Sequence, residues 1–482
     1  MVGDEWRYGG DCFIGFCRPE FSKIVASTFL RIVVPTFLRN VVPDEDPRAK
    51  GIGFWIPDQV RNDNFSLRKP LPLSPFRDDK KEDSSDTTIG KNFKFTVMIL
   101  VINCGSTTLK FRIFDSELKE LAGGLVDRLG QPRTRLDCQV GKKSERRTFA
   151  GGLTDQAAAL SEVFSVLTEA GFETSDITSV GHRVVHGGEE FVRPTRLTRE
   201  VLRRLRKYSR LAPLHNPANL AGIEAAAELL PDVEQVAVFD TAFFSTLPDY
   251  AFIYALPWEY YSRHGIRKYG FHGISHRYVS EEAARRLHKP LGRVNLITCH
   301  LGGGSSVTAI EGGQAVDTSM GFTPLQGLTM ATRCGDIDPS IPLFMVDTLG
   351  LTVDEAHDVL NHDSGLKGLT GHADLREVLV QLGEGIGGFG SRRRPTKSEL
   401  ERSQVAVDKL CYDVARYIGS YTALLGRVDA VVFTGGVGEN SASIRRRVMA
   451  RLKLRPKLKT LVVPTNEELM IAREVKAVGV GV

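Results

Sequence analysis

The chain has 482 residues, of which 42% are hydrophobic and 25% charged, so it is long enough for two or three domains with sizeable cores. Its net charge of +5 is not gathered into a basic stripe interleaved with aromatic residues, which argues against nucleic-acid binding. No apolar run approaches the roughly 18 residues of a membrane span, and seven scattered cysteines without paired CxxC spacing argue against zinc and favour a reducing, cytoplasmic setting.

The first 97 residues differ in character from the rest. They contain a tandem repeat, Thr28–Pro35 followed by Thr36–Pro43, and end in a polar run, Asp78–Thr88. They show neither the sustained periodicity of a folded module nor the apolar core of a signal peptide. We interpret residues 1–97 as an extension outside the folded part that results from a mis-assigned start, with Met98 as the true start. A disordered or regulatory extension is the alternative.

From Met98 onward, two stretches share one build. Met98–Asp115 and Val294–Gly312 each contain an apolar strand, a turn rich in Gly, Ser and Thr, and a second apolar strand. Turns of small residues expose backbone N–H groups and hydroxyls, which is what a phosphate group requires. Two such turns in two halves of the chain predict a duplicated fold that closes on a nucleotide from both sides.

From Met98 onward the pattern alternates strands with helices, which predicts an α/β fold. The predicted helices are Asp155–Ala170, Pro217–Leu230, Ser280–His288 and Glu399–Leu425, and two predicted buried strands are Val236–Asp240 and Ala430–Thr434. The second of these strands leads into a Gly-rich turn, Gly435–Gly438, which is typical of a nucleotide contact. Gly383–Ser398 is predicted to be a flexible surface loop.

The polar residues that can carry chemistry fall in compact clusters. These are Gly181–Glu189, Ala212–Asn219, Phe239–Phe244, Arg267–His276, Asp317–Pro339, Phe433–Ser441 and Pro464–Leu469. The absence of GxSxG, HExxH and Walker A motifs leaves hydrolase, zincin and P-loop interpretations without support. Arg183 and Arg333 stand in these clusters, and a guanidinium fork can hold a carboxylate or phosphoryl oxygens, although a structural role for either arginine stays open at this point.

In order and length, these clusters closely resemble the acetate and short-chain acyl kinase family over nearly all of residues 98–482. The resemblance implies the two-domain fold shared by actin, Hsp70 and sugar kinases, with ribonuclease H-like motifs. It places residues 98–245 with 464–482 in one domain and 246–463, with the adenosine site, in the other. It also implies a cytoplasmic, homodimeric phosphotransferase acting on a carboxyl group. That enzyme would move the γ-phosphate of ATP to acetate by reversible in-line transfer, with Mg²⁺ or Mn²⁺, giving acetyl phosphate and ADP.

Four residues match the catalytic positions of the family: Arg183, Asp240, His272 and Arg333. In the family the matching arginines hold acetate and the transferring phosphoryl group, and the resemblance implies that His272 and Arg333 stabilise the transition state. The matching aspartate orients an arginine or the water shell of the metal. Because the acceptor carboxylate is already ionised at pH 7, no strong base is needed, and we expect cations and positioning to dominate.

The remaining histidines divide into two groups. His215 and His300 match histidines that support the phosphate site, whereas a structural role is the stronger interpretation for His186 and His276. Asn103 and Glu467 match residues around the Mg²⁺ site, with Glu468 as the neighbouring alternative to Glu467. Such sparse protein ligands are expected, because Mg²⁺ usually keeps several waters.

The family positions for the nucleotide fall on two phosphate turns, an adenosine site and a Gly-rich turn beneath it. The matching residues here are Ser106, Thr108, Lys110, His300, Gly302, Gly303, Gly304, Asp374, Leu375, Arg376, Gly435, Gly436, Val437, Gly438, Glu439 and Asn440. For Lys110, an outward-facing strand position is the alternative. Gly303 replaces the asparagine that is usual in the family, so we predict weaker but not abolished nucleotide binding.

The acyl group is expected next to Arg183, in an apolar pocket formed by Val185, Leu214, Phe271 and Pro324. Propionate kinases tend to carry a smaller residue at the position of Val185, so valine favours acetate. One methylene is worth only about 1–3 kcal/mol in such a pocket, so propionate should be a slower substrate. Propionate kinase is therefore one alternative, and a non-catalytic ATP-binding protein on the same fold is another.

Overall fold

The computed structural model describes residues 97–384, 393–454 and 456–479 of the chain. The interpretation of residues 1–97 as an extension therefore lies outside the described residues, apart from residue 97. Residues 385–392 of the predicted surface loop lie outside them as well. No helix in the described ranges has the length and apolarity needed to cross a membrane.

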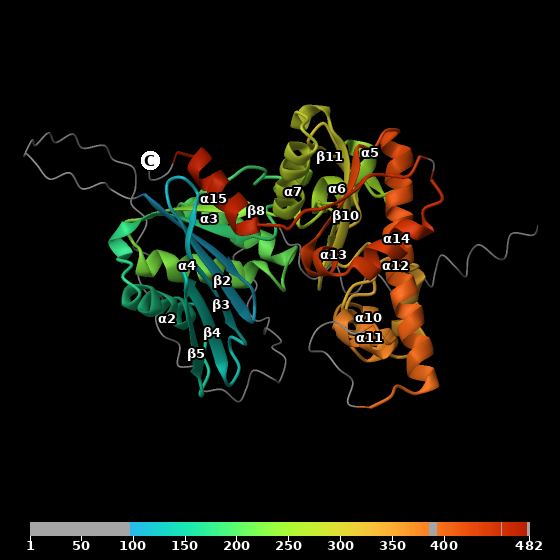
Figure 1. The fold of residues 1–482 in the computed structure, drawn as a ribbon, viewed down its shortest axis with the longest axis horizontal. Coiled ribbons are helices and arrows are strands. Elements are labelled where there is room, and N and C mark those ends of the chain that lie inside the picture. Colours follow the sequence, from blue (N-terminus) through green and yellow to red (C-terminus); the bar gives the residue numbers. More distant parts are fainter. Residues whose placement is uncertain (1–96, 385–392, 455, 480–482) are drawn as a thin grey trace, which may run out of the picture. The chain divides into compact units, whose positions relative to one another are not determined.

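The first half of the described chain forms an eight-stranded mixed sheet, in blue and green in Figure 1. Its strands are β1 (Met98–Cys104), β2 (Thr108–Phe114), β3 (Glu120–Asp127), β4 (Thr134–Val140), β5 (Lys143–Phe149), β6 (Ile177–Val184), β7 (Thr195–Arg196) and β8 (Glu234–Phe239). They lie in the order β5-β4-β3-β2-β1-β6-β8-β7. β1 is antiparallel to β2 and parallel to β6, which is in turn parallel to β8, so β1, β6 and β8 direct their carboxyl ends to one edge.

Successive residues of β1 face opposite sides of this sheet, and each side has its own core. Leu100 and Ile102 pack with apolar residues of α2 (Gln156–Glu169) and α4 (Asn216–Leu229). α3 (Arg199–Lys207) packs beside α4. α2 begins where predicted, because the side chain of Asp155 accepts a hydrogen bond from the backbone N–H of Ala158 and caps the helix.

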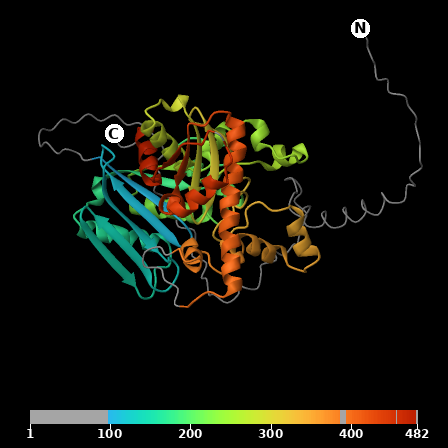
Figure 2. The same ribbon diagram turned by 45° about the vertical axis from the view of Figure 1, so that its right-hand side comes forward.

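The second half forms a five-stranded sheet in the order β11-β10-β9-β12-β13. Its strands are β9 (Asn295–Leu301), β10 (Ser305–Glu311), β11 (Gln314–Thr318), β12 (Ala430–Thr434) and β13 (Thr460–Val462). α7 (Gly273–Arg286) covers one face and the long α12 (Lys397–Leu425), orange in Figure 2, covers the other. The remaining helices are α5 (Asp249–Phe252), α6 (Trp258–His264), α8 (Ser340–Asp347), α9 (Val353–His362), α10 (Gly365–Thr370), α11 (Leu375–Gln381), α13 (Gly435–Asn440) and α14 (Ala442–Arg451).

Both sheets repeat one arrangement, a hairpin whose first strand pairs with a later parallel strand. β1 and β2 with β6 make the first copy, and β9 and β10 with β12 make the second. The two predicted strand–turn–strand stretches and the predicted duplication are therefore confirmed. Two details differ: α7 begins at Gly273 rather than Ser280, and the predicted turn Gly435–Gly438 is the first turn of α13.

The glycine at 435 shows why the turn is so short. Within the turn Gly435–Gly438, Gly435 is the one residue with a left-handed φ, of 76°. A Cβ at this position would lie 2.7 Å from the carbonyl oxygen of Leu301. The residues after Gly435 adopt helical geometry, so β12 passes directly into α13.

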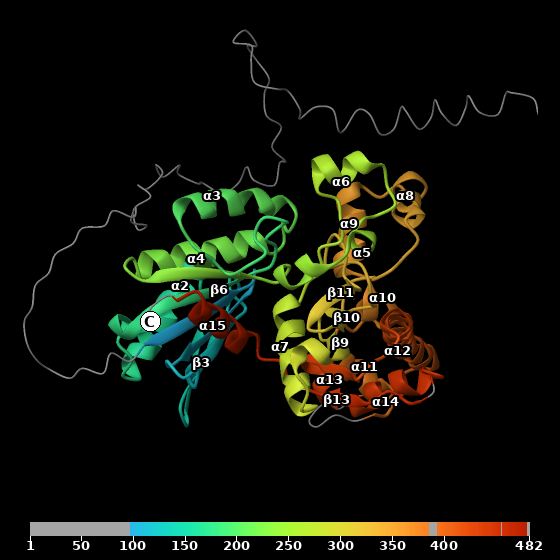
Figure 3. The same ribbon diagram turned by 90° about the horizontal axis from the view of Figure 1, so that it is seen from above.

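The last described helix returns to the first sheet. α15 (Glu467–Ala477) packs against β1 and β6, as Figure 3 shows for the red helix beside β6. Gly181 of β6 makes room for it, because a Cβ there would lie 2.7 Å from side-chain carbons of Ile471 and Val475. The side chain of Asn466 caps the helix by accepting a hydrogen bond from the N–H of Leu469, which places Glu467 at the edge of the sheet.

Candidate active site

A cavity of about 980 Å³ lies where the carboxyl edge of the first sheet meets the turns of the second. It gathers many of the residues predicted from separate clusters of the sequence, namely Asn103, Lys110, Arg183, His272, His300, Gly435, Gly436, Glu439 and Glu467. Residues from both ends of the described chain therefore meet in one cleft.

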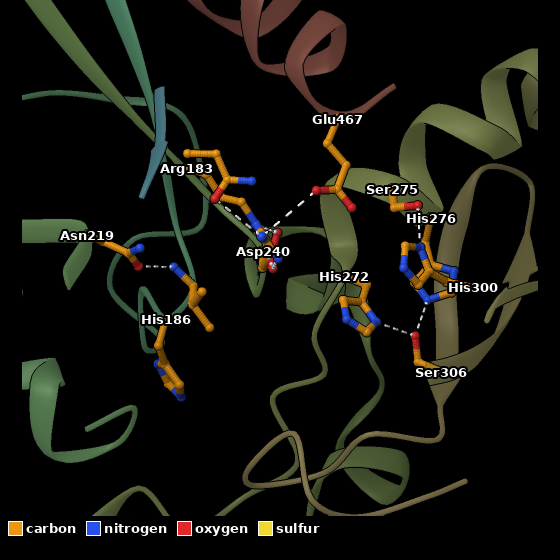
Figure 4. Close-up of polar contacts among 12 residues, drawn as sticks. Arg183, His186, Asn219, Asp240, His272, Ser275, His276, His300, Ser306 and Glu467 are labelled. Carbon is orange, nitrogen blue, oxygen red and sulfur yellow. Dashed lines mark hydrogen bonds and ion pairs between the residues drawn. The ribbon is translucent and has the colours of Figure 1, made fainter. Parts of the chain in front are cut away.

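The centre of the cleft is an ion pair between neighbouring parallel strands. Arg183 is in β6 and Asp240 directly follows β8, so both side chains reach the same edge of the sheet. The Nη2 of Arg183 donates to Asp240 Oδ2 at 2.5 Å, and its Nε lies 3.2 Å from both carboxylate oxygens. Its Nη1 lies 3.5 Å from Asn103 Oδ1. The same Nη1 lies 3.9 Å from Glu467 Oε2, on the α15 side of the cleft (Figure 4). Burial alone would lower the pKa of Arg183, but the carboxylates of Asp240 and Glu467 raise it.

Arg333 is the second predicted cation of the site, and its surroundings differ from those of Arg183. It lies in the loop between β11 and α8, and its Nη1 donates to the carbonyl oxygen of Pro324 at 3.3 Å. Among the described residues, no carboxylate forms an ion pair with it, and burial lowers its pKa. A half-buried guanidinium without a counter-charge is a ready-made receptor for an anion.

His272 and Arg333 converge on the glycine turn between β9 and β10. A Cβ at Gly304 would lie 3.3 Å from His272 Nε2 and 3.4 Å from Arg333 Nη1. The glycine thus leaves open the point that both side chains approach.

The backbone holds His272 in an uncommon conformation at this point. Its φ is +61°, in the left-handed region, and the next residue, Gly273, begins α7. The N–H of Gly273 donates to the carbonyl oxygen of Asp240 at 3.1 Å, and a Cβ at Gly273 would lie 2.0 Å from that oxygen. The histidine is therefore fixed beside the Arg183–Asp240 pair by a contact that only glycine permits.

The histidines of the cleft are neutral. Burial lowers the pKa of His300 and of His215 to about 4, with nearby cations such as Arg183 adding to the effect. Burial also lowers the pKa of His272 further below its usual value, assisted by His300, whose ring stacks on it with centroids 4.3 Å apart. At pH 7 these rings therefore act through hydrogen bonds rather than through charge.

A second cavity, of about 730 Å³, adjoins the first and shares Gly436 with it. Its lining includes many of the residues predicted to bind the nucleotide, namely Gly302, Gly303, Asp374, Leu375, Arg376, Gly436, Val437 and Asn440. Asp374 caps α11 through the N–H of Arg376 at 2.8 Å and pairs with the guanidinium of the same residue. Glu439 ties the glycine turn to residues before α15, because its carboxylate accepts from the N–H groups of Gly435 and Thr465.

Comparison with known proteins decides the family of this chain. A family profile described as the Acetokinase family matches residues 98–455. The chain belongs to the acetokinase family.

Relatives and solved structures agree with this assignment. The chain is 44% identical to an acetate kinase of Clostridium novyi and 45% identical to one of Bacillus cereus, each over 408 residues that cover 79% of this chain and 98% of the relative. A propionate kinase structure from Francisella tularensis matches with a TM-score of 0.72 and 37% identity over 78% of this chain and 98% of that one. The acetate kinase of Porphyromonas gingivalis matches with a TM-score of 0.70 and 36% identity, over 79% and 99%. The predicted fold class, a duplicated α/β fold of the actin, Hsp70 and sugar-kinase type, is confirmed.

Some predicted residues of this acetokinase stand outside the two cavities. Ser106 and Thr108 lie at the turn between β1 and β2 and line neither cavity. Val185 and Phe271 share one buried apolar cluster with Met320 and Met330, whereas Leu214 is 44% exposed. Of these predicted residues, Val185 and Phe271 therefore pack together, whereas Leu214 does not belong to their cluster.

Three site residues were missed by the sequence analysis. Ser275, Thr298 and Ser306 hydrogen-bond to the histidines of the cleft at 2.7–2.9 Å. Hydroxyl residues are common in strands and at helix starts, so nothing in the local pattern marks these three. The one available signal is alternation, which places Thr298 and His300, two residues apart, on the same face of β9.

The glycine at 303 gives a first testable prediction. Gly303 lines the second cavity, and no atom lies within 4 Å of where its Cβ would be, so a side chain fits. Gly303→Asn restores the usual family residue and one hydrogen bond worth about 1 kcal/mol, so we expect the KM for ATP to fall about 5-fold. Steady-state kinetics with Gly303→Ala as control checks this, and an unchanged KM in the asparagine variant would refute it.

The buried neutral histidines give a second prediction, on acid stability. Burial lowers the pKa of His182, His186 and His300 to about 4, whereas the unfolded chain titrates near 6.5. Between those values the unfolded state binds more protons, so stability falls as the pH falls, by up to about 1.4 kcal/mol per pH unit for each histidine. Urea unfolding at pH 7 and pH 5 measures this. His182→Gln should show a shallower pH dependence, and equal slopes in both proteins would contradict the assignment.

Proposed function

We propose that this acetokinase is an acetate kinase, which transfers the γ-phosphate of ATP reversibly to acetate and yields acetyl phosphate and ADP. The observation that carries the proposal is the convergence of His272 Nε2 and the unpaired guanidinium of Arg333 on Gly304. The neighbouring Gly302 and Gly303 line the second cavity, and His272 lines the cleft with Arg183. The names of the curated relatives support the same activity.

The reaction needs electrostatic help more than proton transfer. An oxygen of the acetate carboxylate attacks the γ-phosphorus in line, and the bond from that phosphorus to the bridging oxygen of ADP breaks. Because the carboxylate is already ionised at pH 7, no base has to remove a proton. The obstacle is the approach of one anion to another, so positioned cations and hydrogen-bond donors supply the catalysis.

Each residue has a part in this scheme. Arg333 has no carboxylate partner in the described ranges, so it is free to hold acetate or the transferring phosphoryl group. Arg183 is fixed by Asp240 and offers its Nη1 side to the cleft. His272 donates from Nε2 to a phosphoryl oxygen, and Lys110 and His300 line the path of the phosphates.

The residues present fit a magnesium ion. Glu467 and Asn103 offer hard oxygen donors on either side of Arg183 Nη1, and burial raises the pKa of the Glu467 carboxyl although Arg183 opposes it. Glu468 lies instead 3.7 Å from Arg112, so Glu467 is the better candidate. No cluster of three or more metal-ligating side chains occurs in the part of the chain that the structure describes. This suits Mg²⁺, which takes one or two carboxylates together with phosphate oxygens and would neutralise phosphate charge here, with Mn²⁺ as a substitute.

Propionate kinase is the second candidate, favoured by the similarity to the Francisella structure. Val185, packed with Phe271 in a buried cluster, limits the room for an extra methylene and favours acetate. The test is formation of acyl phosphate by the full chain from ATP, Mg²⁺ and either acid, trapped with hydroxylamine. A higher kcat/KM for acetate supports the proposal. A higher value for propionate supports the second candidate, and no product from a folded chain that binds ATP would make it a binding protein only.

We further propose that residues 98–245 with 464–482 form one domain, that residues 246–463 form the other, and that the chain acts in the cytoplasm as a homodimer. The packing of α15 on the first sheet supports the boundaries, and the free state of Cys104, Cys138, Cys299, Cys334 and Cys411 supports a reducing compartment. Large apolar side chains exposed on and beside α6 and α8 support self-association, namely Leu256, Trp258, Leu343, Phe344 and Leu349. Light scattering would detect the dimer, and Leu343→Glu should shift the mass to that of a monomer.

A further inference from the structure

A continuous line of buried hydrogen bonds leads into His272 from the second sheet. Thr298 Oγ1 lies 2.7 Å from His276 Nδ1, His276 Nε2 lies 2.7 Å from Ser306 Oγ, and Ser306 Oγ lies 2.9 Å from His272 Nδ1. Thr298, His276 and Ser306 are each fully buried. Figure 4 shows Ser306 between the two imidazole rings. Four side chains from β9, β10 and the start of α7 thus form one chain of donors and acceptors.

The hydrogen bonds along this line can point in only two directions. The Ser306 hydroxyl carries one hydrogen, so it donates to one histidine and accepts from the other. If it donates to His272 Nδ1, then His276 carries its proton on Nε2 and accepts from Thr298 on Nδ1. If it donates to His276 Nε2, then His276 carries its proton on Nδ1 and donates to Thr298, and His272 carries its proton on Nδ1. Both histidines are neutral in either case, because burial lowers the pKa of each.

Thr298 decides between the two directions. In the described structure its hydroxyl contacts His276 and has no other hydrogen-bond partner. In the second direction the hydrogen of this buried hydroxyl would have no acceptor, which costs about 1–3 kcal/mol. In the first direction every donor along the line has an acceptor. The first direction is therefore the more stable one, and its hydrogen bonds polarise one another in the same sense.

We propose that Thr298, His276 and Ser306 are positioning residues that fix His272 as its Nε2–H tautomer, with the proton aimed at the point in front of Gly304. The role of that proton, donation to the transferring phosphoryl group, rests on the proposed function, whereas the tautomer follows from the hydrogen-bond line alone. A bare Nε2 would instead present a lone pair to an anion. The sequence predicted a structural role for His276, and in this proposal that role is to orient the hydroxyl of Ser306.

The direct test is the tautomer itself. In full-length protein labelled with ¹⁵N-histidine, long-range ¹H–¹⁵N correlation separates a protonated ring nitrogen from a bare one, and the signals missing in His272→Gln belong to His272. We expect a protonated Nε2 and a bare Nδ1. A protonated Nδ1 with a bare Nε2 would overturn the inference. The measurement requires no catalysis, so a protein without acetate kinase activity but with the expected tautomer would refute only the proposed function.

Variants of Thr298 test the cause. Thr298→Val keeps the volume but removes the hydroxyl, so we expect mixed His272 tautomers and a kcat about 10-fold lower with an unchanged KM for ATP. Thr298→Ser keeps the hydroxyl and should restore both. The matched control is Thr308→Val, because Thr308 is the cross-strand partner of Thr298, is equally buried, and bonds to Thr318 instead of a histidine.

The results of these variants show whether the line of hydrogen bonds sets the tautomer of His272. If Thr298→Val leaves the tautomer and kcat as in the wild type, or if Thr308→Val lowers kcat equally, the hydrogen-bond line does not set the tautomer. If Thr298→Val does not fold, Ser306→Ala serves the same purpose, because it removes the donor to His272 Nδ1 directly. Retention of the wild-type tautomer in Ser306→Ala would likewise overturn the inference.

Discussion

Replacing Arg333 with alanine should lower kcat for acyl phosphate formation by about 10³-fold without lowering the stability of the fold. The guanidinium is half-buried, its pKa is lowered by burial, and no carboxylate pairs with it among the described residues. Removing it takes away the main free cation for an anionic transition state, and it also removes an uncompensated charge from the protein interior. Activity and stability should therefore move in opposite directions, or stability should stay constant.

Two measurements check this expectation. Hydroxylamine-trapped acyl phosphate gives kcat, and urea unfolding gives the free energy of unfolding. Arg333→Lys should recover part of the activity, because an ammonium restores charge but not the planar fork. A loss of stability that accompanies the loss of activity would show that Arg333 is a structural residue instead.

Asp240→Asn should have the opposite signature, a loss of both activity and stability. Asp240 is 1% exposed and accepts three hydrogen bonds from Arg183, so neutralising it leaves a half-buried cation with only Glu467, at 3.9 Å, as a counter-charge. Breaking a buried pair on one side costs about 3 kcal/mol, and the freed Arg183 would lose the orientation that it needs in the cleft. We expect kcat to fall by at least about 10²-fold.

The double variant Arg183→Met, Asp240→Leu separates the two effects. Two apolar side chains of similar size replace the pair, and the Glu467 carboxylate, 3.9 Å from Arg183 Nη1, is the charge that loses a neighbour. Part of the stability should therefore return while activity stays low. Urea unfolding and kcat together decide the matter. If Asp240→Asn keeps wild-type stability and activity, then hydrogen bonding suffices at this position and the charge of Asp240 has no role.

Sequence patterns predicted correctly the helices and strands whose ends are set by residues at those ends, such as a helix cap. The strand Ala430–Thr434 agrees residue for residue with β12, and Asp155 caps α2 where the sequence places a helix start. The start of α7 was missed because its signal is not local. His272 adopts a left-handed conformation and Gly273 contacts the backbone of Asp240, so the helix begins at a tertiary contact.

The site residues, like the helices, could be predicted only where their signal is local in the sequence. The strand end at Asp240 and the motif around Arg183 each identify a candidate, but the 2.5 Å contact between them depends on β6 lying next to β8. Glu467 was assigned through resemblance to the family, and its position depends on α15 docking against β1 and β6. Ser306 and Thr298 could not be found, because their hydrogen-bond partners His272 and His276 come from the start of α7, which packs against β9.

The docking of α15 also constrains how the protein is made. The first sheet begins with β1 at Met98, yet the face that carries Ile99 and Val101 is closed by Ile471 and Val475. During synthesis on a ribosome, this apolar face therefore stays without its cover until nearly all of the described chain has emerged. Contacts so distant in sequence form late and slowly. A nascent chain truncated before residue 467 would expose the sheet to chaperones and proteases, and it would lack Glu467 in the cleft. Completion of the fold is thereby tied to completion of synthesis.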